Sequence, residues 1–178
     1  MKLTTLSATA MTVVFAAFSA TTVFAGGSHS DNQSSSTDIG QPGQADHVDR
    51  TINVEMGEMF FLASDYNLKP GETVRFVITN TGEFLHEFSI ATEEMHLAHA
   101  GEMMAMMDSG MIEVDRVNMA MMKSKGNSHD DANSLLIEPG KTGEVIWTFD
   151  GDAVVEMSCN LPGHRESGMR GILNLIGS

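Results

Sequence analysis

The segment "CNLPGHRESGM", residues 159–169, contains three side chains that bind soft metal ions. Cys159 is the only cysteine of the chain, and His164 and Met169 follow it at equal spacings. Thiolate and thioether groups hold Cu(I), imidazole accepts both copper oxidation states, and two histidines, one cysteine and a weak axial methionine form blue-copper electron-transfer sites. Zinc fits less well, because structural zinc sites favour several cysteines and do not use methionine. The alternative is that Cys159 is a small buried apolar residue and His164 a surface residue.

A fourth ligand is available in "NTGEFLHEFSI", residues 80–90, where His86 stands in an alternating pattern. On a strand, His86 shares a face with Phe88 and Ile90, so we expect it to point into the apolar interior. Glu87 and Ser89 are expected to point outward. The sequence therefore predicts that His86 joins the three loop residues at one end of the domain.

Alternating apolar residues predict the strands that must position these ligands. The pattern covers residues 52–56, 72–80 and 144–150, and further strands are expected at 84–90, 153–159 and 171–177. Pro-Gly turns at 69–72 and 138–141 precede two of them, with Gly expected at positive φ. We expect an all-β, Greek-key β-sandwich of roughly seven short antiparallel strands.

Residues 92–130 interrupt the strands with a segment rich in methionine and histidine. Its composition predicts at least one helix within 92–124, followed by a polar loop. Two interpretations stay open, a secondary Cu(I) site and packing against the sandwich. The candidate Cu(I) ligands are His96, His99, Met103, Met106 and Met107, and the candidate packing stripe is Leu97, Met104, Met107 and Met111.

The amino terminus has the layout of a secretory signal peptide. One lysine precedes a short apolar stretch, and small residues suit cleavage after Ala25, so residues 1–25 predict export to the periplasm. An uncleaved membrane anchor is the alternative. Residues 26–46 are polar and predict a disordered leader, which leaves 47–178 as one domain. His29, His47 and His129 lie in polar segments and are expected to be solvated.

Charge and motifs exclude several functions. The net charge of −14 argues against nucleic-acid and anionic-membrane binding, and favours cations or basic protein partners. The chain contains no His-x-His pair of the kind that multicopper oxidases and copper nitrite reductases use, and nothing resembles a catalytic triad or a phosphate loop. Any enzymatic activity would be cuprous oxidation at the single site.

The ligand set His86, Cys159, His164 and Met169, with "PGH" in the loop and "GMRGILNL" after it, resembles the cupredoxins, the small blue copper proteins. The spacings are similar to rusticyanin, and the inserted segment is similar to the periplasmic copper-tolerance cupredoxins. The resemblance implies one type 1 copper held by these four residues. Two positions depart from the family pattern: Glu87 stands where many relatives have Asn or Ser, and Asn160 stands where many have Ser or Thr.

Two functions follow from this resemblance. The first is a periplasmic, redox-active copper-tolerance protein, and the second is an electron carrier between periplasmic redox proteins. The expected partners are copper ions and either a periplasmic cytochrome or a copper-export component.

Overall fold

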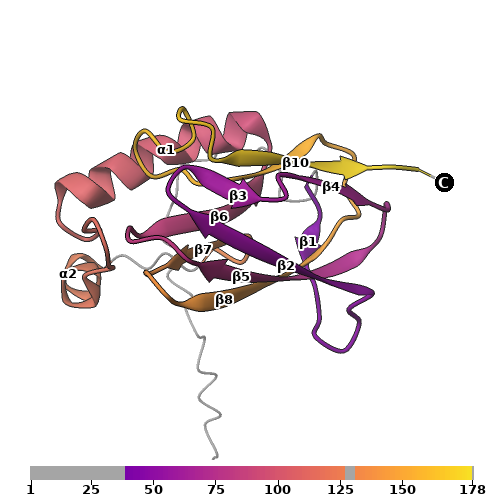
Figure 1. The fold of residues 1–178 in the computed structure, drawn as a ribbon, viewed down its shortest axis with the longest axis horizontal. Coiled ribbons are helices and arrows are strands. Elements are labelled where there is room, and N and C mark those ends of the chain that lie inside the picture. The colour runs from indigo at the N-terminus through magenta and orange to yellow at the C-terminus, as the bar shows by residue number, and fades with distance from the viewer. Residues whose placement is uncertain (1–38, 127–130, 178) are drawn as a thin grey trace, which may run out of the picture. The chain divides into compact units, whose positions relative to one another are not determined.

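The computed structural model describes residues 39–126 and 131–177 as two sheets of five strands each (Figure 1). The first sheet has the order β1 (Gln41–Pro42), β8 (Thr142–Thr148), β5 (Thr73–Asn80), β2 (Arg50–Gly57) and β3 (Phe60–Leu62). The second has the order β4 (Asp65–Leu68), β10 (Arg170–Leu175), β9 (Val155–Ser158), β6 (His86–Ala91) and β7 (Ser134–Ile137). The predicted β-sandwich with a helical insertion is confirmed. The expected signal peptide, His29 and His129 lie outside the described residues.

The core lies between the two sheets and follows the alternation of the sequence. Strand β2 has the pattern exposed, exposed, buried, exposed, buried, exposed, buried, buried, so its apolar side chains face the other sheet. Aromatic rings join the layers, with the ring centroid of Phe76 lying 5.3 Å from that of Phe88 and 6.2 Å from that of Phe149. Each fully buried side chain of this size contributes about 1.5–3 kcal/mol to folding.

Both predicted Pro-Gly turns are present. Gly71 has φ 80° and Gly140 has φ 69°, the left-handed conformation that glycine adopts without steric cost. The backbone N–H of Glu72 donates to Lys69 O at 3.0 Å, and that of Lys141 donates to Glu138 O at 3.0 Å. These turns set where β5 and β8 begin.

The expectation of purely antiparallel pairing is wrong at two places. Strand β2 pairs with β5 in parallel, and β4 pairs with β10 in parallel. Between β2 and β5 the chain crosses to the second sheet as β4, which allows it to re-enter the first sheet in its original direction. The short strands β1, β3, β4 and β7 were also not expected, because two to four residues give too little alternation to recognise.

Contacts with the domain are present before residue 47, where the sequence predicts the domain to start. Ile39 is 1% exposed, its carbonyl accepts a hydrogen bond from Trp147 Nε1 at 2.8 Å, and Gln41 and Pro42 pair with Thr148 and Trp147. Residues 39–42, which the sequence assigns to the leader, therefore contact the domain. A single isoleucine in a polar segment carries no periodicity, so composition alone could not identify this anchor.

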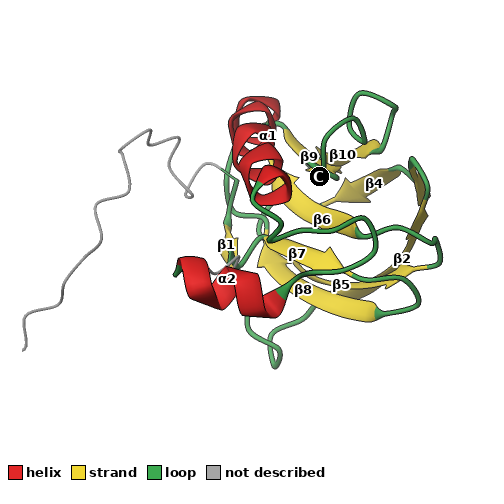
Figure 2. Ribbon diagram, turned by 90° about the vertical axis from the view of Figure 1, so that its left-hand side faces the viewer, coloured by secondary structure: helices red, strands yellow, loops and turns green. Residues whose placement is uncertain are grey.

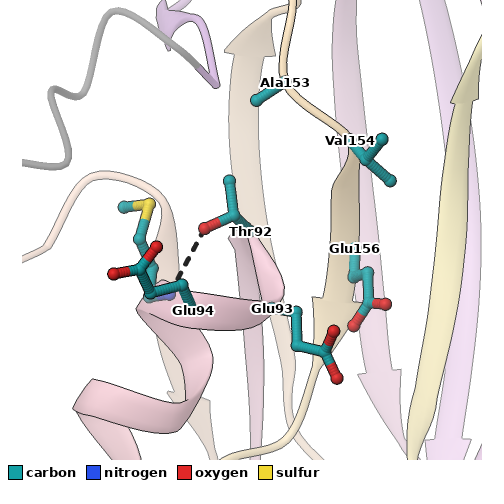
Figure 3. A pocket seen from close by; sticks show the side chains of 7 residues that line it. Thr92, Glu93, Glu94, Ala153, Val154 and Glu156 are labelled. Atoms are coloured by element: carbon teal, nitrogen blue, oxygen red, sulfur yellow. Dashed lines mark hydrogen bonds between the residues drawn. The ribbon is translucent and has the colours of Figure 1, made fainter.

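The insertion contains two helices, α1 (Glu93–Asp108) and α2 (Met119–Lys125). Helix α1 lies beside the second sheet, where it contacts β9 (Figure 2). Thr92 caps its start, since Thr92 Oγ1 accepts a hydrogen bond from Met95 N at 3.3 Å (Figure 3). Neither this helix nor any other in the described residues is long and apolar enough to span a membrane.

The predicted packing stripe is confirmed only in part, because Met111 belongs to the core and Met107 packs against it, whereas Leu97 and Met104 do not. Leu97 and Met104 are 61% and 46% exposed, whereas His96, Met103 and Met106 are buried. The helix combines Ala and Met around its whole circumference, so the sequence offers little contrast between faces. Glu87 and Ser89 alternate with the core-facing residues of β6, as expected, yet they are 0% and 3% exposed, and His99 of α1 contacts Glu87, so they do not face solvent.

Candidate metal centre

Three of the predicted ligands meet at one end of the sandwich. His86 is the first residue of β6, Cys159 directly follows β9, and His164 lies in the loop between β9 and β10. Strands β6 and β9 are neighbours in the second sheet, with Ser89 opposite Ser158, so the strand pairing itself brings His86 near Cys159. One ligand atom of each residue lies within 4.8 Å of the other two.

The three donor atoms face one another. His86 Nδ1 lies 3.2 Å from His164 Nδ1, and Cys159 Sγ lies 3.3 Å from the same His164 atom. His86 and Cys159 are fully buried, and His164 is partly buried. Two nitrogens and one sulfur thus converge on one point, which is the donor set of a trigonal copper site.

Burial controls the protonation of these ligands. Burial, followed by the neighbouring His164, lowers the pKa of His86 to about 4. Burial also lowers the pKa of His164. Burial, followed by the negative charge of Glu87, raises the pKa of the Cys159 thiol to about 12. The imidazoles are therefore neutral and ready to donate lone pairs, while a thiolate requires a cation beside it.

Met169 occupies the carboxyl end of the ligand loop and is fully buried. Its backbone N–H donates to His164 O at 3.0 Å, and its carbonyl accepts from Cys159 N at 3.1 Å. Gly168, at φ 102°, makes the turn that returns the chain to this position. The backbone therefore holds Met169 next to both loop ligands.

Glu87 is the functional residue that sequence reasoning missed. Its backbone N–H donates to Cys159 Sγ at 3.3 Å. Its carboxylate accepts from Asn160 N at 2.9 Å, Asn160 Nδ2 at 2.8 Å and Ser134 Oγ at 2.6 Å. The signal was present, because Glu87 and Asn160 are the two departures from the cupredoxin pattern, and the structure joins them to each other.

A second buried charge supports the same loop. Arg165 is 7% exposed, and its guanidinium donates to Ser158 Oγ at 3.0 Å and to Glu156 Oε2 at 2.7 Å. Its Nη2 also lies 3.9 Å from Glu93 Oε1 at the start of α1. This arginine ties the ligand loop to β9 and to the inserted helix.

Glu58 lies behind His86, on the side away from the other ligands. Glu58 Oε1 is 3.8 Å from His86 Nε2 and accepts hydrogen bonds from the backbone of Glu83 at 2.5 Å and of Phe84 at 3.1 Å. The bond from Glu83 is the main reason that the pKa of Glu58 is lowered. A carboxylate near the outer nitrogen of a ligating histidine orients the ring and raises its basicity.

The proposed secondary ligands differ in burial and in their contacts. His96, Met103 and Met106 are buried, Met103 and Met106 belong to the core, and Met107 is partly buried. His99 contacts two carboxylates, with Nε2 at 3.0 Å from Glu87 Oε1 and Nδ1 at 3.1 Å from Glu102 Oε2. His47 is exposed beside Asp46. Among the described residues, the group of histidine, cysteine and acidic side chains that could hold a metal is His86, Cys159 and His164.

A pocket of about 400 Å³ opens next to the start of α1 and shares no residue with the metal centre (Figure 3). It is lined by Thr92, Glu93, Glu94, Met95, Ala153, Val154 and Glu156. Its carboxylates are hard ligands and its lining includes no imidazole or thiolate, so it does not suit copper in the way the ligand cluster does.

Comparisons with known proteins agree with this donor set. The sequence model of a family described as copper binding proteins, plastocyanin/azurin family, matches residues 48–176. The copper-resistant cuproprotein CopI of Pseudomonas aeruginosa is 40% identical over 153 residues, covering 77% of this chain and 82% of that protein. The protein of the same name from Rubrivivax gelatinosus is 35% identical, covering 76% of this chain and 72% of that protein.

Solved structures resemble the fold at low sequence identity. Auracyanin B aligns with a TM-score of 0.55 and 17% identity, covering 79% of this chain and 95% of that one. The reduced auracyanin of Roseiflexus castenholzii aligns with a TM-score of 0.53 and 17% identity, covering 72% of this chain and 98% of that one. These two similarities concern the fold alone.

Proposed function

Because the chain belongs to the plastocyanin/azurin family of copper-binding proteins, as a cupredoxin related to copper-resistance proteins, we propose that it is a redox-active copper-tolerance protein of the periplasm. The observation that carries the proposal is the convergence of His86, Cys159 and His164 at a buried point. These residues, with Met169, would hold one copper. Bound copper supplies a one-electron redox centre.

The chain's own residues prepare this site. The neutral imidazoles of His86 and His164 offer lone pairs, and burial keeps water away from the donor atoms. Hydrogen bonds hold the loop closed around Cys159, so little rearrangement is needed when the charge of the site changes. Export is supported by the signal-peptide pattern of residues 1–25, and the CopI relatives carry copper resistance in their names.

The direct test is a copper titration of the purified protein. We expect Cu(II) to produce an intense visible band from a copper–thiolate bond, and we expect Cys159→Ser to abolish it. His47→Leu, which removes an exposed imidazole outside the cluster, serves as the control and should keep the band. A colourless wild-type protein would exclude the proposed site.

The cellular part of the proposal needs a separate experiment. Deleting the gene should increase copper sensitivity, the wild-type gene should restore growth, and the Cys159→Ser gene should not. Fractionation of the same cells should recover the protein from the periplasm. Equal growth of the deletion strain and its parent on copper would argue against a role in tolerance.

An electron-carrier function is the second candidate, and the net charge of −14 favours it. An acidic surface steers a basic partner such as a cytochrome, and such steering weakens as salt screens the charges. Electron exchange with a periplasmic cytochrome should therefore be fast at low salt and slower at high salt. Slow exchange at every ionic strength would leave copper tolerance as the better explanation. Cuprous oxidation at the single site is the one enzymatic activity that this ligand set could support.

A further inference from the structure

We propose that helix α1 sets the reduction potential of the copper centre through an ion pair between His99 and Glu87, two residues that are not among the four predicted type 1 copper ligands. The inference rests on the proposed copper function. In this role the inserted segment does not bind additional copper. Its helix supplies a positive charge, His99, which holds the buried Glu87 carboxylate in place near the Cys159 thiolate and offsets its negative charge.

The Glu87 carboxylate is the meeting point of three separate segments. We call Glu87, His99, Ser134 and Asn160 the Glu87 cluster. His99 comes from α1, Ser134 is the first residue of β7, and Asn160 belongs to the ligand loop. Four donor atoms at 2.6–3.0 Å point at a carboxylate that is fully buried. A charge in such a place is stable only with partners of this number and kind.

The cluster is connected to the thiolate by two short routes. Asn160 follows Cys159 in the chain and gives both its backbone N–H and its side-chain amide to Glu87. Glu87 in turn donates its own backbone N–H to Cys159 Sγ at 3.3 Å. A shift of the Glu87 carboxylate therefore moves both the residue after the cysteine and a hydrogen bond to the sulfur. Hydrogen bonds to the sulfur are among the features that tune the potential of such sites.

The His99 side chain faces Glu87 with one nitrogen and Glu102 with the other. Burial alone lowers its pKa, but the hydrogen bond and charge of Glu87, followed by those of Glu102, outweigh burial and raise it to about 9. The imidazole is thus a cation at neutral pH. The neighbouring negative charge of Glu87 favours the more highly charged, oxidised metal, and the His99 cation offsets this effect.

This balance predicts shifts of opposite sign. His99→Leu removes the cation and should lower the potential. Glu87→Gln removes the anion while keeping an acceptor for Asn160, and it should raise the potential at about pH 5, where Glu102 still favours a protonated His99. For each variant we expect about a tenfold change in the ratio of Cu(I) to Cu(II) affinity, which corresponds to about 59 mV for one electron. Mere loosening of the fold would shift both variants in the same direction.

The experiment compares the full-length wild-type protein with His99→Leu, Glu87→Gln and the control His47→Leu. The potential is measured by redox titration, and the copper–thiolate band shows that each variant has loaded. In the apo-proteins, the amide NMR signal of Asn160 reports on the cluster without any metal. It should move in both cluster variants and stay in place in His47→Leu.

The outcomes separate this inference from the proposed function. Shifts of opposite sign in His99→Leu and Glu87→Gln support it. Potentials equal to that of His47→Leu, or shifts in one common direction, overturn it and leave the copper function intact. A wild-type protein without the visible band would instead refute the copper function, and an Asn160 signal unchanged in both apo variants would refute the cluster itself.

Discussion

His96 and His99 show how strongly the partner of a buried imidazole determines its charge. The two residues lie three positions apart on α1, yet burial lowers the pKa of His96 to about 4, and Arg165 adds to the decrease. His96 contacts a neutral carbonyl, Glu156 O, at 3.3 Å, whereas His99 contacts the Glu87 carboxylate. One histidine is therefore neutral and the other positively charged on the same helix.

This contrast predicts a pH dependence of stability. The pKa of His99 is raised from 6.5 to about 9 in the folded protein. The contribution of His99 to the free energy of unfolding is therefore fully present below pH 6.5 and is lost as the pH rises through 9. We expect the stability difference between the wild-type apo-protein and His99→Gln to shrink from pH 6 to pH 9.5 in urea denaturation. Parallel pH curves for the two proteins would contradict this assignment.

Arg165 gives a second prediction for a single residue. Arg165→Leu leaves Glu156 and Ser158 without their partner and should lower the free energy of unfolding by about 3–5 kcal/mol, as removal of one member of a buried ion pair does. Arg170→Leu is the matched control, because Arg170 is exposed at the start of β10 and should change stability by less than about 0.5 kcal/mol. Similar losses in both variants, measured by urea denaturation, would show that the Arg165 contacts contribute little.

At the scale of elements, helix α1 combines packing and electrostatic roles on one face. Met103 and Met106 enter the core, while His99 on the same side reaches Glu87. Methionine fills irregular gaps well, which suits a helix packed against the uneven surface of a twisted sheet. The thioethers of Met103 and Met106 are therefore used for packing in this conformation.

Two methionine variants test this division. Met103→Ala should lower the free energy of unfolding by about 2–5 kcal/mol, because it opens a cavity in the core. Met104→Ala, next to it but 46% exposed, should cost less than about 0.5 kcal/mol. A Cu(I) titration of both apo-proteins completes the comparison: lost Cu(I) binding in the stable Met104→Ala variant would show that exposed thioethers handle copper.

The sequence was sufficient to predict strands that show a repeated pattern, and it was insufficient to predict features that occur only once in the fold. Alternation located β2, β5 and β8, and the ligand motif indicated the residues that the structure brings together as His86, Cys159 and His164. The burial of Glu87 could not be predicted, because alternation assumes that one face of a strand meets water. Helix α1 removes that condition at Glu87, because His99 contacts its carboxylate.

At the scale of the whole molecule, the metal centre is an addition to a complete core. The buried apolar residues of both sheets and α1 form one contiguous cluster that includes Cys159 and Met169. Small proteins that depend on metal to fold lack such a core. The donor atoms of this protein already face one another at 3.2 and 3.3 Å.

Removal of copper should therefore leave the protein folded. We expect the far-ultraviolet circular dichroism of the apo-protein to match that of the copper-loaded form. Copper at 100 times its dissociation constant should raise the free energy of unfolding by about 2.7 kcal/mol. The measurement is thermal unfolding with and without copper, with Cys159→Ser as the variant that should gain least. An apo-protein with the spectrum of an unfolded chain would contradict a preformed site.

Strand β6 has a consequence for the mutational tolerance of the protein. All six of its residues are buried, whereas β2 alternates exposed and buried positions. In a library of single substitutions selected for copper-dependent colour, β2 should accept polar exchanges at its exposed positions. Strand β6 should show six consecutive intolerant positions, because one face contacts the core and the other is also buried, with His99 and Asn160 against Glu87. The burial of both faces thus removes the tolerant half of the strand that begins with His86.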